Sequence, residues 1–277
     1  MKTILVATDF SNAANNAVKY AAQFAAATNH DIFLMNTYIP SVPQYSSVHA
    51  LISDETHDET HRNHLKLLHL LEKVAPVSSE TYVAVGDPVA EILNAAKVKK
   101  ANIVVVGTHG ATGVRSALFG SNTSKIIAKS NLPVLSVPAK YRFQKIDTIL
   151  YATDTKNTIN ELKVLIPIAK LLNAAIEIVY MKYAWDKNPQ VKIDLEKKIK
   201  ALRFKNITLI ERKAGIEKPL TEQLKGYIRQ RKPQMLAMFP ADKSWFDKFF
   251  TGSKTEDIAF ELKVPLLSIR KRLVAKD

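Results

Sequence analysis

The chain has 277 residues, 47% of them hydrophobic and 8% aromatic, which is typical of folded proteins and not of disordered ones. It has no cysteine, which excludes disulfides, thiol catalysis and thiolate metal sites and favours a reducing compartment. No apolar run is long enough for a signal peptide or a membrane span. We therefore expect a cytoplasmic protein of one or two domains, with no membrane insertion.

The formal net charge of +14 is unevenly distributed along the chain. Residues 1–140 hold 12 basic and 10 acidic residues, whereas residues 141–277 hold 28 and 16. A basic half can indicate an anionic partner such as nucleic acid. The lysines of residues 192–205 have no interleaved aromatic residues and match no nucleic-acid-binding motif, so a solvated lysine-rich surface is the preferred interpretation.

In the first half, apolar runs typical of buried strands alternate with helical segments. Strands are expected at 3–7, 31–38, 80–85, 103–106 and 132–137. Helices are expected at 12–28, from the end of the following loop to about residue 74, at 88–97 and around 125–128. Residues 40–53 are expected to form a long loop, because they are polar and contain two prolines. Such alternation predicts an α/β, doubly wound, Rossmann-like domain with a parallel sheet covered on both faces.

The pattern then repeats, which predicts a tandem duplication. The segment TILVATD (3–9) returns as TILYATD (148–154), an offset of 145. Later in each copy, Gly120-Ser121 returns as Gly252-Ser253, an offset of 132. At the first offset Thr28 aligns with Asn173 and Tyr38 with Tyr183. The expected domains are residues 1–140 and 145–277.

Residues 107–123 contain four of the eight glycines of the chain, spaced Gly107-x2-Gly110-x9-Gly120-Ser121. This spacing is neither a P-loop nor the GxGxxG dinucleotide fingerprint. It places a glycine-rich loop between a buried strand and a helix N-terminus, where close backbone approach, free N–H groups and the helix dipole favour a phosphate. Asp9 ends the first strand at the same sheet edge, so the sequence predicts a nucleotide site there.

The glycine spacing, the strand that ends in Asp9 and the closing LPVLSVP strand together resemble the universal stress protein family. The resemblance covers the whole chain as two such domains in tandem. It implies a five-stranded parallel sheet in each domain, of the adenine-nucleotide alpha-hydrolase-like class. It also implies ATP, with Mg²⁺, in the first domain, and pairing of the two domains through residues 134–137 and 266–269.

Carried over to this sequence, the family's nucleotide contacts fall on three groups of residues. Ala7, Thr8 and Asp9 would line the adenosine, and Asn36 and Thr37 would meet the adenine edge largely through their backbone. Gly107, Thr108 and His109 would lie beside the ribose, and Gly110, Gly120, Ser121, Asn122 and Thr123 would hold the phosphates. The chain departs from the family at Asn122, where a small apolar residue is usual, and at Asn36-Thr37, where His-Val is frequent.

The second copy departs further, because Phe239 and Asp242 stand at the positions of Gly107 and Gly110. Bulk and negative charge there oppose a phosphate, so we expect that the second domain does not bind ATP in the same way. The contrast also indicates that the fold does not require these two glycines, which favours a ligand as the reason for them in the first copy.

Two further interpretations concern histidine. His57 and His61 are spaced i, i+4 on an expected helix, with His64 nearby, which permits a metal site; an exposed polar helix start is the preferred interpretation, and no metal is expected. His109 is either a general base or a loop residue that packs on ribose, and packing is preferred. No catalytic set stands out, so no catalytic residue is assigned.

The leading hypothesis is a binding protein that holds ATP in its first domain and acts as a stress- or energy-responsive regulatory switch towards an unknown protein partner. The first alternative is a slow ATPase or nucleotide-transferring enzyme, and the second is a nucleotide-independent scaffold. A homodimer is a further expectation.

Overall fold

The computed structural model describes residues 2–39, 49–73, 77–108, 120–183, 190–218, 220–240, 263–271 and 274, with side chains in the long second helix from Asp58 onward. The chain forms two compact units, Met1–Phe143 and Gln144–Asp277. None of the described helices combines the length and hydrophobicity that a membrane-spanning segment needs.

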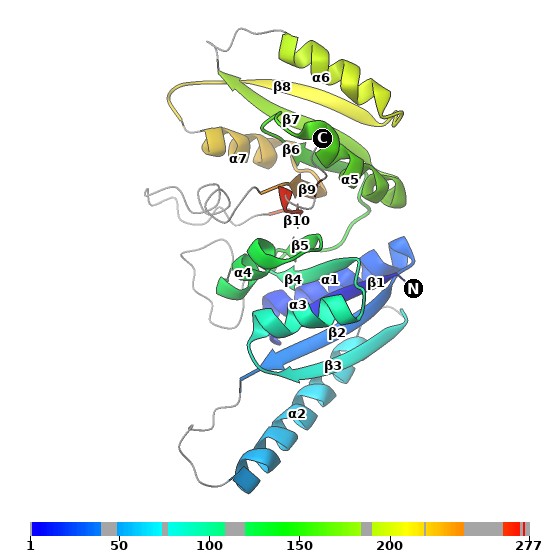
Figure 1. The fold of residues 1–277 in the computed structure, drawn as a ribbon, viewed down its shortest axis with the longest axis vertical. Coiled ribbons are helices and arrows are strands. Elements are labelled where there is room, and N and C mark those ends of the chain that lie inside the picture. Colours follow the sequence, from blue (N-terminus) through cyan, green and yellow to red (C-terminus); the bar gives the residue numbers. More distant parts are fainter. Residues whose placement is uncertain are drawn as a thin grey trace. The chain divides into compact units, whose positions relative to one another are not determined.

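The first unit is a parallel sheet in the order β3-β2-β1-β4-β5. Right-handed crossovers place α1 and α2 on one face and α3 and α4 on the other (Figure 1). Its strands are β1 (Thr3–Thr8), β2 (Asp31–Tyr38), β3 (Ser79–Val85), β4 (Ile103–Gly107) and β5 (Val134–Val137). Its helices are α1 (Asn12–Thr28), α2 (His49–Glu72), α3 (Pro88–Val98) and α4 (Ser121–Lys129).

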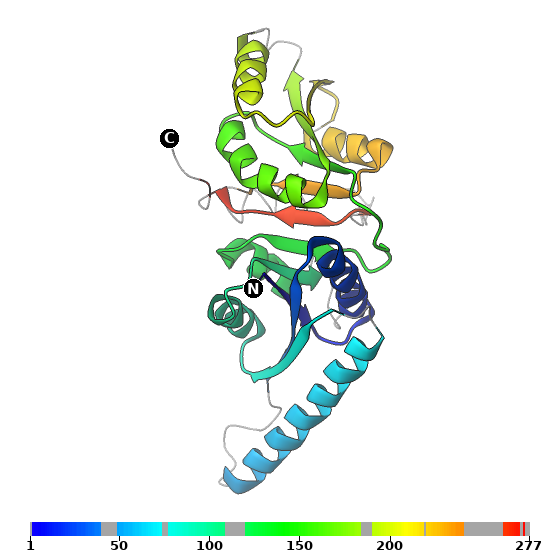
Figure 2. The ribbon, with the colours of Figure 1, turned by 90° about the vertical axis from the view of Figure 1, so that its right-hand side faces the viewer.

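The apolar runs form the central strands, as expected. Ile4, Leu5 and Val6 of β1 and Val104 and Val105 of β4 have no exposed surface, because helices cover both faces of the sheet. In Figure 2, α2 runs obliquely and extends beyond the edge of this sheet. This helix begins at His49, earlier than expected, so residues 49–53 belong to the helix and not to the loop.

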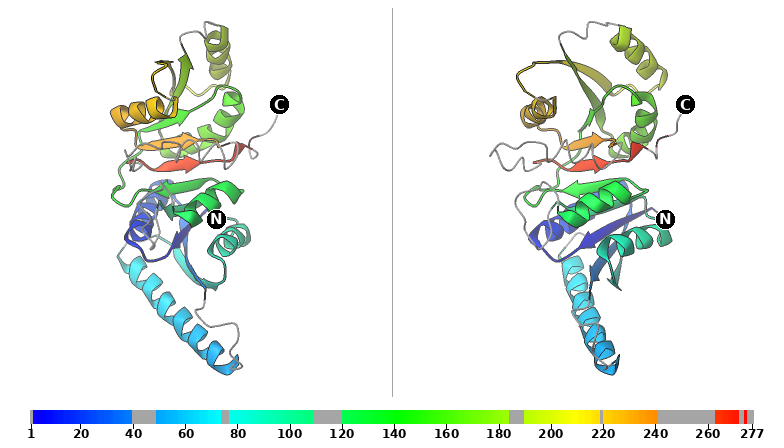
Figure 3. Two further views of the ribbon diagram at one scale, coloured as in Figure 1. Left: turned by 90° about the vertical axis from the view of Figure 1, so that its left-hand side faces the viewer. Right: turned by 60° about the vertical axis from the view of Figure 1, so that its left-hand side comes forward.

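The second unit repeats this architecture with the sheet order β10-β9-β6-β7-β8. Figure 3 shows α5 and α6 on one face and α7 on the other. Its strands are β6 (Thr148–Ala152), β7 (Ala175–Tyr183), β8 (Ile207–Ala214), β9 (Met235–Met238) and β10 (Leu266–Ser268). Its helices are α5 (Thr158–Leu172), α6 (Gln190–Ala201) and α7 (Leu220–Arg231). The prediction of two α/β halves with parallel sheets is confirmed.

Strand register confirms the duplication and corrects one detail of it. Ile4 pairs with Ile103 in the first unit and Ile149 with Met235 in the second, which reproduces the offsets of 145 and 132. The helices that follow end in equivalent left-handed caps, Asn29 and Asn173, with φ of 52° and 53°. Asn173 therefore corresponds to Asn29 and not to Thr28, because α5 has 15 residues where α1 has 17.

Candidate functional site

The turn after β1 holds Asp9 at the carboxyl edge of the first sheet. Thr8 Oγ1 accepts a hydrogen bond of 3.0 Å from the Phe10 N–H, and Asp9 Oδ1 accepts one of 3.0 Å from the Ser11 N–H. Phe10 adopts a positive φ of 62°, and the Ser11 hydroxyl caps α1 by accepting from the Ala14 N–H. These local bonds fix the turn and leave the Asp9 side chain exposed.

Asn36 lies beside this turn, because β2 pairs with β1 in a register that sets Asn36 opposite Thr8. Its Nδ2 donates to the Thr8 carbonyl at 2.8 Å, which fixes the orientation of the carboxamide. The side chain is only 4% exposed, and its Oδ1 has no hydrogen-bond partner. A buried acceptor without a donor costs about 1–3 kcal/mol, so a donor on a ligand would remove a real penalty here.

The glycine-rich segment begins and ends on a closed backbone frame. The Gly120 N–H donates to the Thr108 carbonyl at 2.8 Å, and the Thr108 N–H donates to the Val137 carbonyl at 3.1 Å. The N-cap of α4 is Gly120, which has no side chain to cap the helix, whereas Ser11 and Asp87 cap α1 and α3. The first turn of α4 therefore suits an anion that accepts from its N–H groups.

Three predicted phosphate residues of α4 differ in their surroundings. Ser121 and Asn122 are exposed at its start. Thr123 is buried, and its hydroxyl donates to the Gly107 carbonyl at 2.8 Å. This bond joins α4 to the end of β4, so Thr123 stabilises the backbone that surrounds the site.

Gly107 is required by packing, contrary to what the contrast with Phe239 indicated. A Cβ on Gly107 would lie 2.9 Å from the Ala13 carbonyl carbon and 2.9 Å from the Ala14 nitrogen, closer than real Cβ atoms approach. Because the obstacle is helix backbone, it cannot move aside cheaply. The glycine lets the first turn of α1 lie against β4, and this is sufficient reason for it without a ligand.

The remaining predicted site residues are distributed as follows. Ala7 and Thr37 are half-buried near the same strand ends. His109, Gly110 and the side chain of His57 lie outside the described residues. His61 is exposed and His64 half-buried, and among the described residues no three His, Asp or Glu side chains gather in a way that could hold a metal ion.

The second unit keeps the aspartate turn but changes what faces it. Thr153 Oγ1 accepts from the Thr155 N–H and Asp154 Oδ1 from the Lys156 N–H, with Thr155 at a φ of 69°, as in the first unit. Phe239 is buried and meets the Tyr151 ring edge-on at 5.5 Å. α5 begins four residues after Asp154, whereas α1 begins three residues after Asp9. The later start of α5 occurs in the unit that has Phe239 in place of the glycine. Asp242, Gly252 and Ser253 lie outside the described residues.

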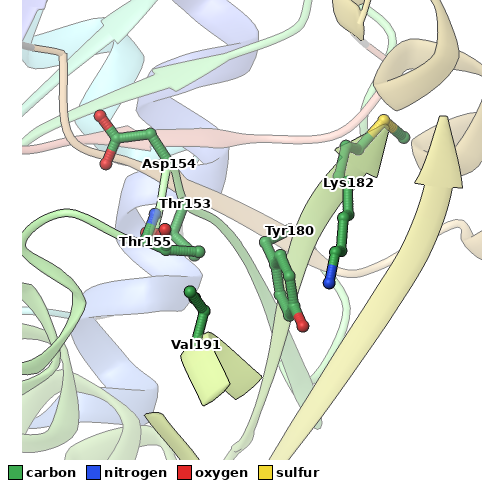
Figure 4. A pocket seen from close by; sticks show the side chains of 7 residues that line it. Thr153, Asp154, Thr155, Tyr180, Lys182 and Val191 are labelled. Atoms are coloured by element: carbon green, nitrogen blue, oxygen red, sulfur yellow. The ribbon is translucent and has the colours of Figure 1, made fainter. Parts of the chain in front are cut away.

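Two features of the second unit escaped sequence reasoning. The first is a polar pocket of about 130 Å³ at the ends of β6 and β7, beside the first turn of α6 (Figure 4). It is lined by Thr153, Asp154, Thr155, Tyr180, Met181, Lys182 and Val191. The second is Lys271, whose Nζ lies 2.8 Å from Asp154 Oδ2 although 117 residues separate the two. The repeated Thr-Asp pair was the only sequence signal for either.

Comparisons with known proteins agree with this architecture. Residues 1–138 match the universal stress protein family. Universal stress protein YxiE of Bacillus subtilis is 32% identical over 143 residues, 48% of this chain and 97% of that protein, and universal stress protein MJ0577 of Methanocaldococcus jannaschii is 28% identical over 50% and 96%. A universal stress protein from Archaeoglobus fulgidus matches 97% of this chain and 98% of its own with a TM-score of 0.68 at 16% identity, which shows a shared fold. The chain therefore belongs to the universal stress protein family.

Proposed function

We propose that the first unit binds an adenine nucleotide, ATP with Mg²⁺, at the carboxyl edge of β1, β2 and β4. The observation that carries the proposal is the buried Asn36 Oδ1, an acceptor with a fixed direction and no donor, beside the Asp9 turn. An adenine amino group supplies such a donor. The first turn of α4 has no side-chain cap, and α4 follows β4, the strand that pairs with β1. This arrangement supports a phosphate at the same edge.

The described residues divide into those that would touch the nucleotide and those that hold the site. Asp9 would accept from ribose hydroxyls, Asn36 from the adenine amino group, and the backbone of Ser121 and Asn122 would donate to phosphate. Thr8, Thr108 and Thr123 would position these groups through their hydrogen bonds to backbone. The nucleotide, when bound, would supply the charge and the Mg²⁺ site.

We propose binding rather than rapid turnover, with the nucleotide setting the affinity of the chain for a regulatory partner. Two measurements test this: mass spectrometry of the ligand released from purified protein, and an assay of ATP hydrolysis. ATP that is released intact after hours would support a switch. Steady ADP production would instead support the enzyme alternative. A protein that binds no nucleotide would support the alternative of a nucleotide-independent scaffold.

Titration of ATP into matched variants tests the site itself. Asn36→Leu and Asp9→Ala should each weaken binding about 10-fold or more, the effect of one lost buried or charged hydrogen bond. Asp31→Ala is the control, because Asp31 begins β2 at the opposite edge of the same sheet. Equal affinity of all four proteins would refute the placement of the site.

Pairing of the two units through the segments 134–137 and 266–269, a homodimer and a cytoplasmic location are further proposals that rest on the family resemblance and the absence of cysteine. Crosslinking between cysteines introduced into the two segments would test the first.

A further inference from the structure

A charged network occupies the aspartate edge of the second unit. Lys271 follows β10, and its Nζ lies 2.8 Å from Asp154 Oδ2 and 3.6 Å from Glu161 Oε1. The Tyr151 hydroxyl donates to the other oxygen of Glu161. One ammonium group thus donates a hydrogen bond to Asp154 at the sheet edge and lies within ion-pair distance of Glu161 in α5, whose Oε1 has no hydrogen-bond partner.

The network runs from the surface to a buried end. The Asp154 side chain is 43% exposed, that of Lys271 25% and that of Glu161 1%. Burial raises the pKa of Glu161, while the Tyr151 hydrogen bond and the Lys271 charge act against the rise. A carboxylate in such a place depends on its cation, because removal of one member of a buried ion pair leaves an uncompensated charge.

The first unit has uncharged residues at the equivalent positions. The strand offsets of 145 and 132 pair Val6 with Tyr151, Asn16 with Glu161 and Ala139 with Lys271. Three separate replacements in the second unit thus meet in one network around the aspartate that both units share.

Anchoring of the chain after the last strand does not explain the lysine. In the first unit Asn16 performs this task, since its Nδ2 donates to the carbonyls of Pro138 and Tyr141 at 2.9 and 2.8 Å. A neutral amide on the first helix is enough for anchoring. The ammonium of Lys271 adds what an amide lacks, which is a charge directed at Asp154.

We propose that Lys271 is a built-in occupant of the Asp154 edge, held by Glu161, and that it closes this edge to a nucleotide. The lysine takes the place at the aspartate that ribose hydroxyls would take in the first unit. In Figure 4 the Asp154 carboxylate is directed away from Tyr180, Lys182 and Val191. The expected effect of such a lysine on ATP binding in the first unit rests on the proposed function, whereas the ion pairing of Lys271 in the second unit does not.

Thermal unfolding of charge-removal variants tests the occupant without any ligand. Lys271→Met keeps the aliphatic stem and should lower Tm by about 5–10 °C, because Glu161 loses its cation. Adding Glu161→Gln should recover at least half of that loss, since the uncompensated charge disappears. Lys145→Met is the matched control: Lys145 also lies 2.8 Å from an aspartate, Asp147, but is 75% exposed, and a shift below about 2 °C is expected.

Equal small shifts for Lys271→Met and Lys145→Met would overturn the proposal. So would a double variant no more stable than Lys271→Met alone, because Glu161 would then not be the group that needs the cation. If Lys271→Met does not fold, the double variant still decides the question by its own Tm.

Transfer of the lysine to the first unit tests its effect on binding. Ala139 is half-buried at the equivalent position, so Ala139→Lys brings an ammonium group to the Asp9 edge. ATP affinity should fall about 10-fold or more, whereas Ala139→Met, of similar length without charge, should change it less than about threefold. Equal affinities of both variants would refute closure by charge. Failure of the wild-type chain to bind any nucleotide would refute the proposed function, while the Tm series would still decide the role of Lys271.

Discussion

Gly107 lies where the end of β4 meets the first turn of α1, and its contacts make a direct prediction. Gly107→Ala would force a Cβ to within 2.9 Å of helix backbone, so we expect a loss of about 1–3 kcal/mol in the free energy of unfolding. Urea denaturation measures it.

Gly226 provides the matched control for this change. It lies inside α7, and a methyl group at this position would meet no neighbouring atom within 4 Å beyond its own helix backbone. Gly226→Ala should therefore stabilise the chain by about 0.5–1 kcal/mol through helix propensity. A neutral Gly107→Ala variant would show that α1 can shift, and would return the glycine to a ligand-based explanation.

His30, at the junction of α1 and β2, predicts a pH dependence. Burial lowers its pKa below the ordinary 6.5, although the hydrogen bond to the Thr28 carbonyl opposes the shift. The unfolded state then binds the proton more readily, so stability is complete above pH 6.5 and falls as the pH drops through 6.5 towards the folded-state value. Urea denaturation at about pH 7.5 and about pH 5.5 should show this loss, and His30→Gln should reduce it.

At the level of elements, the start of α4 depends on one buried hydroxyl. Thr123→Val keeps the shape but leaves the Gly107 carbonyl without its side-chain donor, so we expect a loss of about 1–2 kcal/mol in the free energy of unfolding. Ser121→Ala, exposed at the same helix start, should leave stability unchanged within about 0.5 kcal/mol. If the two variants were equally stable, α4 would be held to β4 by something other than this bond.

Elements and their order were predictable because they follow from local pattern. The runs of β1 and β4 are short and rich in β-branched residues, which favours strands, whereas the 17-residue length and alanine content of α1 favour a helix. The repeat TILVATD and TILYATD then set the architecture of both units.

Contacts between distant residues were not predictable in the same way. The Lys271–Asp154 ion pair and the Thr123–Gly107 bond depend on where strands and helices meet in space. The interpretation of Gly107 failed for this reason, because the contact that requires a glycine is with the backbone of α1, far earlier in the chain. The same limit applied to Asn36, whose unpaired oxygen shows only once β1 and β2 are in register.

For the whole molecule, the site proposed in the first unit and the closure proposed for the second together predict one nucleotide for each chain. The two aspartate turns share their geometry, so the backbone of the turn does not distinguish the two units. What separates them is the surroundings: a buried unpaired acceptor beside Asp9, and a lysine bound to Asp154. We therefore expect native mass spectrometry with excess ATP to show a single nucleotide per 277-residue chain.

Two variants assign that nucleotide to a unit. Asp9→Asn should reduce its occupancy strongly, because the carboxylate proposed to accept from the ribose is lost, whereas Asp154→Asn should leave occupancy unchanged, because its carboxylate is paired with Lys271. Two nucleotides per chain would show that the lysine does not close the second edge. One nucleotide that disappears with Asp154→Asn and persists with Asp9→Asn would reverse the assignment, and would make the pocket between β6, β7 and α6 the binding site of this chain.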